Sequence, residues 1–225
     1  MRVGVTGWNG FIGGHLLKRL NNPILFEGGS GFMEDIVKFV NGCDRIYHLA
    51  GLNRAHFGGI LVNNLSFTGR LVLAVKQLTP QPEVIFISST HAEWNANSEY
   101  GLTKGIEEEL IKRVDKWCIF RVPNVYGEAC KPFYNSVVAT FAYQIARGET
   151  PTINDPRETR EFIYVGDLID VLLKPTLGKV IHPEGETMSI GEIYELLTSR
   201  LGEHQKLQRC LDYYKEAENV SSSHG

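Results

Sequence analysis

Short apolar runs alternate with longer segments of helical spacing through the first half of the chain, and this alternation limits the possible folds. The runs short enough to be buried strands are 2–6 (RVGVT), 23–26 (PILF), 44–51 (DRIYHLAG), 83–89 (EVIFISS) and 116–122 (KWCIFRV). Segments with helical spacing lie between them, at 11–20, 32–40, 64–78 and 100–114. Strands separated by helices are typical of a parallel sheet covered by helices on both faces. We therefore expect a doubly wound α/β fold.

The regular alternation loosens after residue 125. The later segments predict a helix at 135–148, a strand that leads into a helix at Gly166–Asp167, and a further helix at 187–202. This C-terminal part is too small to fold alone. We expect a dinucleotide-binding core at 1–125 and a smaller substrate-binding portion at 126–225, packed as one unit.

Composition and charge exclude several classes of protein. The formal net charge is -3 and no basic block is present, which argues against a nucleic-acid partner. No apolar run approaches the length of a membrane span. The four cysteines are scattered without metal-ligand spacing, so we expect reduced thiols, a cytoplasmic location and no metal site.

Three glycines follow the first predicted strand in the segment TGWNGFIGGHL, at Gly7, Gly10 and Gly13. In dinucleotide-binding folds the first such glycine permits the tight turn and the second lets backbone approach the pyrophosphate. The third lets the helix pack closely on the strand, and the free N–H groups at the start of the helix attract phosphate. The alternative is a purely structural turn, because turns collect glycine. The strand–turn–helix context favours a dinucleotide site in a Rossmann-type fold.

The second strand is followed by Glu27, with no arginine or lysine nearby. An acidic residue at this place bonds the ribose 2′-hydroxyl of NAD, whereas a basic residue accommodates the 2′-phosphate of NADP. Gly28, Gly29 and Ser30 come next, and none of them is basic. The sequence thus favours NAD, with a solvated loop glutamate as the alternative for Glu27.

A tyrosine and a lysine, Tyr100 and Lys104, are one helical turn apart in SEYGLTKG. Their helix follows the fourth strand, which ends in the hydroxyl residues Ser88, Ser89 and Thr90. A phenol with an ordinary pKa of about 10 is a poor acid–base group near pH 7, and a neighbouring ammonium lowers that pKa. The set predicts redox catalysis in which the tyrosine moves the proton, the lysine supports it and a hydroxyl positions the reacting oxygen.

Together with the glycine loop, these residues resemble the extended branch of the short-chain dehydrogenase/reductase superfamily, the NAD-dependent epimerases and dehydratases. Three further stretches fit the resemblance, YHLAG at 47–51, FRVPNVYGE at 120–128 and TREFIYVGDL at 159–168. The resemblance implies Thr90, Tyr100 and Lys104 as catalytic residues. It implies that the cofactor is held by Gly7, Gly10, Phe11, Ile12, Gly13, Glu27, Leu49, Ala50, Gly51, Asn64, Ser88, Tyr100, Lys104 and Val122.

A closer resemblance is to the reductase domain of bifunctional capsular-polysaccharide enzymes of the UDP-N-acetyl-L-fucosamine pathway. It is found in HLAGLNRA, in CKPFYNSVVATFAYQIARGE and in the short gap between Thr90 and Tyr100. It implies NADPH-dependent reduction of a 4-keto-6-deoxy sugar nucleotide. The implied substrate-binding residues are Arg54, Ser89, Thr90, His91, Asn124, Lys131, Tyr134, Asn135 and Arg160. A surface salt bridge is the alternative for Arg160, and loop packing is the alternative for Arg54, Lys131, Tyr134 and Asn135. For His91 the alternative is a loop histidine without a substrate contact.

Those bifunctional enzymes also carry a metal-binding cupin domain, which these 225 residues do not contain. We therefore expect only the reductase chemistry here. Whether a separate cupin partner exists is left open, as is the choice between NAD and NADP.

Two other functions remain open from the sequence. One is a sugar-nucleotide 4-epimerase that retains NAD, and the other is a dinucleotide-binding sensor or scaffold, against which the tyrosine–lysine pair argues. A 4,6-dehydratase is disfavoured, because His91 and Ala92 stand where an Asp-Glu pair would follow the threonine. We expect the run Glu107–Glu109 to be a solvated helix face. By the resemblance we expect a homodimer that pairs the helices at 65–78 and 100–114.

Overall fold

The computed structural model describes residues 1–28, 32–54, 59–94 and 98–222. For Trp94 and for residues 220–222 it describes the backbone alone. The chain forms two compact units. Unit 1 comprises Met1–Val122 and Ile169–Pro183, and unit 2 comprises Pro123–Leu168 and Glu184–Gly225. The predicted division near residue 125 lies close to the first crossing at Val122. The return of 169–183 to unit 1 was not predicted.

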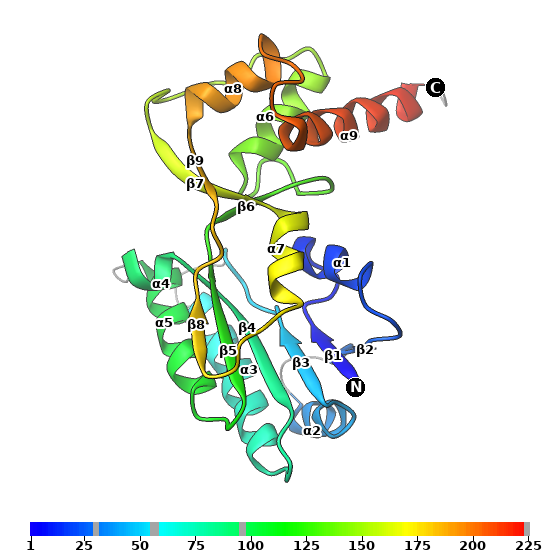
Figure 1. Ribbon diagram of the computed structural model, residues 1–225, viewed down its shortest axis with the longest axis vertical. Helices are drawn as coiled ribbons and strands as arrows, with labels where there is room; N and C mark the ends of the chain where they lie inside the picture. Colours follow the sequence, from blue (N-terminus) through cyan, green and yellow to red (C-terminus); the bar gives the residue numbers. More distant parts are fainter. Residues whose placement is uncertain (29–31, 55–58, 95–97, 223–225) are drawn as a thin grey trace. The chain divides into compact units, whose positions relative to one another are not determined.

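Unit 1 is built on a six-stranded parallel sheet of order β2-β1-β3-β4-β5-β8 (Figure 1). The strands are β1 (Val3–Thr6), β2 (Ile24–Leu25), β3 (Arg45–His48), β4 (Glu83–Ser89), β5 (Trp117–Val122) and β8 (Lys179–Ile181). The order reverses between β1 and β3, so the ends of these strands form the place where such sheets bind ligands. This arrangement confirms the predicted Rossmann-type α/β fold.

Helices cover both faces of this sheet. They are α1 (Phe11–Leu17), α2 (Met33–Asn41), α3 (Gly59–Lys76), α4 (His91–Trp94), α5 (Glu99–Ile111) and the end of α7 (Val165–Leu172). On one face α2, α3 and α5 pack beside one another, and Ile46 joins Leu71 and Phe86 in an apolar core there. The side chain of Tyr47, the next residue of β3, points to the opposite face of the sheet, because successive strand side chains alternate between faces. There its hydroxyl donates to the carbonyl oxygen of Leu172 in α7.

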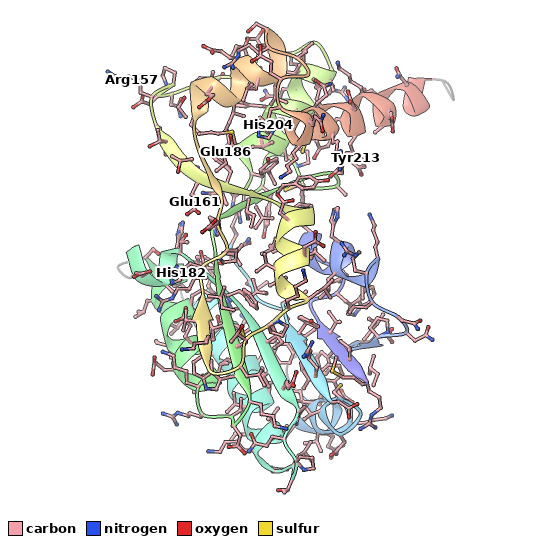
Figure 2. The ribbon with its side chains drawn as sticks, viewed as in Figure 1. Arg157, Glu161, His182, Glu186, His204 and Tyr213 are labelled. Carbon is pink, nitrogen blue, oxygen red and sulfur yellow. The ribbon has the colours of Figure 1, made fainter. Side chains whose placement is uncertain are left out.

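Unit 2 has a three-stranded sheet of order β6-β7-β9. Strand β6 (Asn124–Tyr126) is parallel to β7 (Thr159–Tyr164), and β9 (Glu186–Ser189) is antiparallel to it. Three helices, α6 (Val137–Ala146), α8 (Ile190–Thr198) and α9 (Gln205–Ser222), pack together in this unit. Glu186 and His204 lie side by side (Figure 2), with His204 Nε2 2.9 Å from Glu186 Oε2, which ties β9 to the segment before α9.

Several predicted elements have other bounds in the structure; the helix expected at 64–78, for example, is α3 and begins at Gly59. The helix expected at 187–202 begins at Ile190, because residues 187–189 form β9 and pair with β7, as Met188 does with Arg160. Pairing with a distant strand here overrides local helical spacing. Helix α7 begins at Val165, one residue before the expected Gly166–Asp167 junction.

Candidate active site

The glycine turn after β1 has no room for side chains at two of its three glycines. Gly7 has a φ of +67°, and a Cβ there would lie 2.6 Å from the Ala50 backbone nitrogen. A Cβ on Gly13 would lie 2.4 Å from the Gly7 carbonyl oxygen. Gly10 caps α1 without any side-chain hydrogen bond to the first helical turn. The turn is therefore tightly packed, and no side chain caps the N–H groups at the start of α1. Both features are typical of a turn that binds pyrophosphate.

This turn forms one wall of a cavity of about 700 Å³ that lies wholly within unit 1. Such a volume is within the usual range for a cofactor site. The lining residues come from the turn, the end of β2, the end of β3 and α3: Gly7, Trp8, Asn9, Gly10, Phe26, Glu27, Gly28, Leu49, Ala50, Gly51, Leu52, Asn63, Asn64 and Phe67. Phe11 and Ile12, also predicted at the cofactor, begin α1 directly after Gly10 and are half-buried.

Glu27 is the one charged residue among those lining residues. Gly28 beside it is crowded by the Asp35 side chain, since a Cβ on Gly28 would be 3.0 Å from Asp35 Cβ. Trp8 closes the turn against β2 through its indole N–H, which donates to the Phe26 carbonyl oxygen at 3.1 Å. Gly29 and Ser30, which the sequence argument also used, lie outside the described residues.

Tyr100 and Lys104 are on the first turns of α5, which Ser98 caps by accepting a hydrogen bond from the Gly101 N–H at 3.0 Å. The Lys104 side chain is buried, with 7% of it exposed. Its Nζ donates to the Ile87 carbonyl oxygen at 3.2 Å and lies 4.5 Å from the centre of the Phe86 ring. A Cβ on Gly51 would be 3.5 Å from this Nζ, so the lysine reaches the wall of the cavity.

The hydroxyl residues at the end of β4 have three different environments. Ser88 donates its hydroxyl to Glu108 Oε1 at 2.5 Å, so its side chain is engaged in the interior. Ser89 accepts from the His91 N–H at 3.2 Å. Thr90 is buried, and its N–H donates to the carbonyl oxygen of Val122 at 3.2 Å. The predicted contact of Ser88 with the cofactor stays a prediction.

His91 begins α4, and its ring meets the Tyr100 ring edge to face with the centres 5.9 Å apart. The predicted substrate histidine and catalytic tyrosine are therefore neighbours. Glu93, two residues further along α4, has its Oε2 3.3 Å from Arg121 Nη1. That carboxylate is engaged in a salt bridge.

The prediction that Glu107–Glu109 form a solvated face is wrong for two of the three. Glu107 is fully buried and Glu108 has 1% of its surface exposed, while Glu109 faces solvent and pairs with Lys112. Glu108 binds Arg121 through both carboxylate oxygens. Glu107 Oε2 is 3.0 Å from Lys104 Nζ. Their partners explain the burial, because buried carboxylates require opposite charges and donors.

A chain of buried hydrogen bonds continues from Glu107 to the cavity wall. Thr68 donates to Glu107 Oε1 at 2.6 Å, and its oxygen is 2.9 Å from His48 Nε2. His48 Nδ1 is 2.8 Å from the Thr6 hydroxyl, which accepts from the Ala50 N–H at 3.2 Å. Burial, with the Lys104 charge nearby, lowers the pKa of His48 from 6.5 to about 3, so this imidazole is neutral. The sequence predicted no catalytic or positioning role for Glu107, Thr68, His48 or Thr6.

Asn64 lines the cavity but directs its amide to backbone. Its side-chain oxygen accepts from the Leu52 N–H at 2.8 Å and its nitrogen donates to the Leu52 carbonyl at 2.9 Å. These bonds hold the Gly51–Leu52 segment against α3. The predicted contact of Asn64 with the cofactor stays a prediction.

The predicted substrate residues are divided between the units. Arg54 is an exposed residue of unit 1, and Ala55 after it lies outside the described residues. In unit 2, the Asn124 side-chain nitrogen donates to the Glu161 carbonyl oxygen at 3.0 Å. Lys131 Nζ is 5.3 Å from the centre of the Tyr134 ring, and Asn135 is exposed. Arg160 binds Glu158 at 2.6 Å, which is the salt bridge considered as its alternative role.

The four cysteines are free and buried. Burial raises the pKa of Cys43 to about 12 and raises that of Cys210 further, so both remain thiols at neutral pH. Within the ranges that the structure describes, no group of three or more His, Cys, Asp or Glu residues could hold a metal ion. No helix in those ranges is both long and apolar enough to cross a membrane.

The chain belongs to the NAD dependent epimerase/dehydratase family, whose profile matches residues 30–191. A curated relative, the UDP-2-acetamido-2,6-beta-L-arabino-hexul-4-ose reductase of Pseudomonas aeruginosa, is 33% identical over 217 residues. The alignment covers 88% of this chain and 57% of that enzyme. The chain thus spans a little over half the length of this relative.

Solved structures show the same architecture. The capsular polysaccharide assembling protein CapF of Staphylococcus aureus aligns with a TM-score of 0.79 at 26% identity, over 97% of this chain and 67% of CapF. The UDP-glucose 4-epimerase of Thermotoga maritima aligns with a TM-score of 0.83 at 17% identity, over 97% of this chain and 100% of the epimerase. At this low identity the second likeness shows the fold alone.

Proposed function

We propose that this chain is a nicotinamide-dependent reductase of a nucleotide-linked sugar, most specifically of its 4-keto group. The observation that carries the proposal is the placement of Lys104, one turn from Tyr100 on α5, with its Nζ against Gly51 in the wall of the glycine-lined cavity. The name of the Pseudomonas aeruginosa relative, a UDP-hexulose reductase, supports the substrate class.

In this proposal the cavity holds the dinucleotide, which supplies the hydride. The glycine turn and the first turn of α1 receive the pyrophosphate, because Gly7 and Gly13 leave backbone accessible where a Cβ would collide. Glu27 accepts hydrogen bonds from the ribose hydroxyls. With no cation among the described lining residues, the cavity favours a 2′-hydroxyl over a 2′-phosphate and so NAD over NADP.

Tyr100 acts as the proton donor to the sugar oxygen. Lys104 favours the charged form of the phenol that remains after this transfer, since an ammonium attracts a phenolate. Thr90, supported by Ser89, holds the reacting oxygen, and His91 packs against the tyrosine ring. We assign the recognition of the sugar and its diphosphate to Arg54, Asn124, Lys131, Tyr134, Asn135 and Arg160.

Reduction is tested with UDP-2-acetamido-2,6-dideoxy-hexos-4-ulose and either NADH or NADPH, following oxidation of the cofactor. We expect turnover by the wild-type chain and at least a thousandfold loss in Tyr100→Phe, with cofactor binding by fluorescence titration unchanged within threefold. A Tyr100→Phe variant that turns over normally would remove the tyrosine from the mechanism. Tighter binding of NADPH than of NADH would make Glu27 a loop residue.

We further propose that two copies of this chain pair through α3 and α5. Val62 and Leu73 are 62% and 59% exposed on α3, and Leu102 and Ile106 are 48% and 37% exposed on α5. On each helix the two positions recur on one face, and α3 packs beside α5. A second copy would bury these side chains.

A further inference from the structure

A buried carboxylate lies behind the catalytic lysine, and the reaction as proposed does not use it. Glu107 Oε2 is 3.0 Å from Lys104 Nζ, with 0% of the glutamate side chain and 7% of the lysine side chain exposed. Taking two charges out of water is costly, and such a pair is often no more stable than apolar residues of the same size. Stability therefore does not account for its presence, and a role in holding the lysine does.

The hydrogen bonds around Glu107 fit a carboxylate that accepts from its neighbours. Thr68 has one hydroxyl hydrogen, which it donates to Glu107 Oε1. Its oxygen therefore accepts from His48 Nε2–H, and the neutral His48 must accept from the Thr6 hydroxyl through Nδ1. Each of these bonds directs its hydrogen toward the carboxylate. Such chains polarise one another and stabilise a negative charge at their end.

The same chain fixes the carboxylate from three neighbouring elements. Thr68 is on α3, His48 ends β3, and Thr6 ends β1 and accepts from Ala50 in the cavity wall. The other buried glutamate of α5, Glu108, is engaged by Arg121 and Ser88. Lys104 is thus the one cation that the described residues place against Glu107.

We propose that Glu107 is a positioning residue of the reaction, which holds the Lys104 ammonium charged and in place beside the cofactor cavity. This inference rests on the proposed function. Glu107 acts through Lys104 and touches neither substrate nor cofactor. The variant Glu107→Gln keeps the shape of the side chain and removes its charge.

The first test measures kcat, KM and the pH dependence of turnover in Glu107→Gln. We expect kcat to fall at least tenfold with KM for the sugar unchanged within threefold, because the lysine supports the proton transfer. We also expect the alkaline limb of the pH profile to move to lower pH, since a buried ammonium without its counter-ion loses its proton more readily. The matched control is Glu109→Gln, since Glu109 is an exposed glutamate of the same helix. This substitution should leave kcat and the pH profile unchanged.

A double-mutant cycle separates this role from a merely structural one. In single turnovers with excess enzyme, the double variant Glu107→Gln/Lys104→Met should react at the same rate as Lys104→Met alone. The reason is that the lysine through which the carboxylate acts is already gone. An equal slowing in both backgrounds, or a Glu107→Gln variant with wild-type kcat and pH profile, would overturn the inference. Wild-type turnover in Lys104→Met would instead overturn the proposed function.

A second pair of variants covers the case in which Glu107→Gln does not fold. Thr68→Val removes the hydrogen bond to Glu107 and keeps both charges, whereas Thr68→Ser keeps the hydroxyl. We expect a smaller loss of kcat, about threefold to tenfold, in Thr68→Val and recovery in Thr68→Ser. Equal kcat values for the two variants would also overturn the inference.

Discussion

At the scale of the residue, the site depends on which charges are buried and what accompanies them. Lys104 is surrounded by Glu107, the Ile87 carbonyl and the face of Phe86, all of which favour a cation. His48, two hydrogen bonds away from Glu107, is fully buried and neutral. A buried imidazole of this kind makes folding sensitive to acid.

The free energy of unfolding should depend on pH through the titration of His48. Its pKa is 6.5 when unfolded and about 3 when folded, so between these values the unfolded chain binds a proton that the folded chain does not. Stability from this group is therefore complete above about pH 6.5 and falls as the pH is lowered, by about 1.4 kcal/mol per pH unit. Urea unfolding at pH 7 to 5 should show this extra slope in the wild type and not in His48→Gln. Parallel curves for the two proteins would contradict the assignment.

The tyrosine–lysine pair and the glycine turn could be read from the sequence, because both are local patterns. The same helical spacing that joins Tyr100 to Lys104 also places Glu107 one turn beyond the lysine, so this neighbour could have been found as well. The burial of Glu107 and Glu108 could not, since Thr68, Ser88 and Arg121 come from three other elements.

At the scale of the element, the turn between β1 and α1 is the most constrained part of the structure. A Cβ on Gly13 would meet the Gly7 oxygen at 2.4 Å and Trp8 Cα at 2.7 Å, which are backbone atoms that cannot rotate away. The next residue, Gly14, has open space around its Cβ position. Of these two adjacent glycines in one helix, Gly14 has room for a side chain and Gly13 does not.

This contrast gives a matched pair of substitutions. We expect Gly13→Ala to destabilise the protein by about 1–3 kcal/mol, because the helix must move away from the strand. Gly14→Ala should leave stability equal or raise it by up to about 1 kcal/mol through helix propensity. Urea denaturation measures both, and equal stabilities would argue against the close packing of α1 on the turn.

Length alone did not decide which elements could be predicted, since the two-residue β2 was expected and the 18-residue α9 was not. The continuous apolar run at 83–89 matches β4 residue for residue. Strands β6, β8 and β9 have four residues or fewer and were not predicted. Their pairing partners are distant in sequence, as for Phe120 and Ile181, so the pairing and not the local pattern makes them strands.

At the scale of the whole molecule, the chain crosses between its two units three times, after Val122, Leu168 and Pro183. The sequence marked the first crossing by its loss of regular alternation. It did not mark the return, because β8 is recognisable only through its pairing with β5. The cofactor cavity and the tyrosine–lysine pair belong wholly to unit 1, and most of the proposed sugar-binding residues belong to unit 2.

The proposed dimer predicts how the chain should sediment. Leu73→Glu, on the apolar face of α3, should convert a dimer to a monomer because a charge cannot be buried there unpaired. Leu201→Glu is the matched control, since Leu201 is 52% exposed and lies in unit 2. A wild-type monomer at micromolar concentration, or a Leu73→Glu dimer, would rule out this interface.

The central claim, that this family member reduces a sugar ketone, is tested most directly by following the hydrogen. The 4-keto sugar nucleotide is incubated with NADH or NADPH deuterated at the transferred position, and the product is read by NMR. We predict one deuterium at sugar C4 for each cofactor oxidised, and none in Tyr100→Phe. A reduced product without deuterium at C4, or no oxidation of cofactor with the 4-keto substrate, would contradict the reductase. Conversion of the corresponding 4-hydroxy sugar nucleotide to its C4 epimer with no net oxidation of cofactor would point to an epimerase.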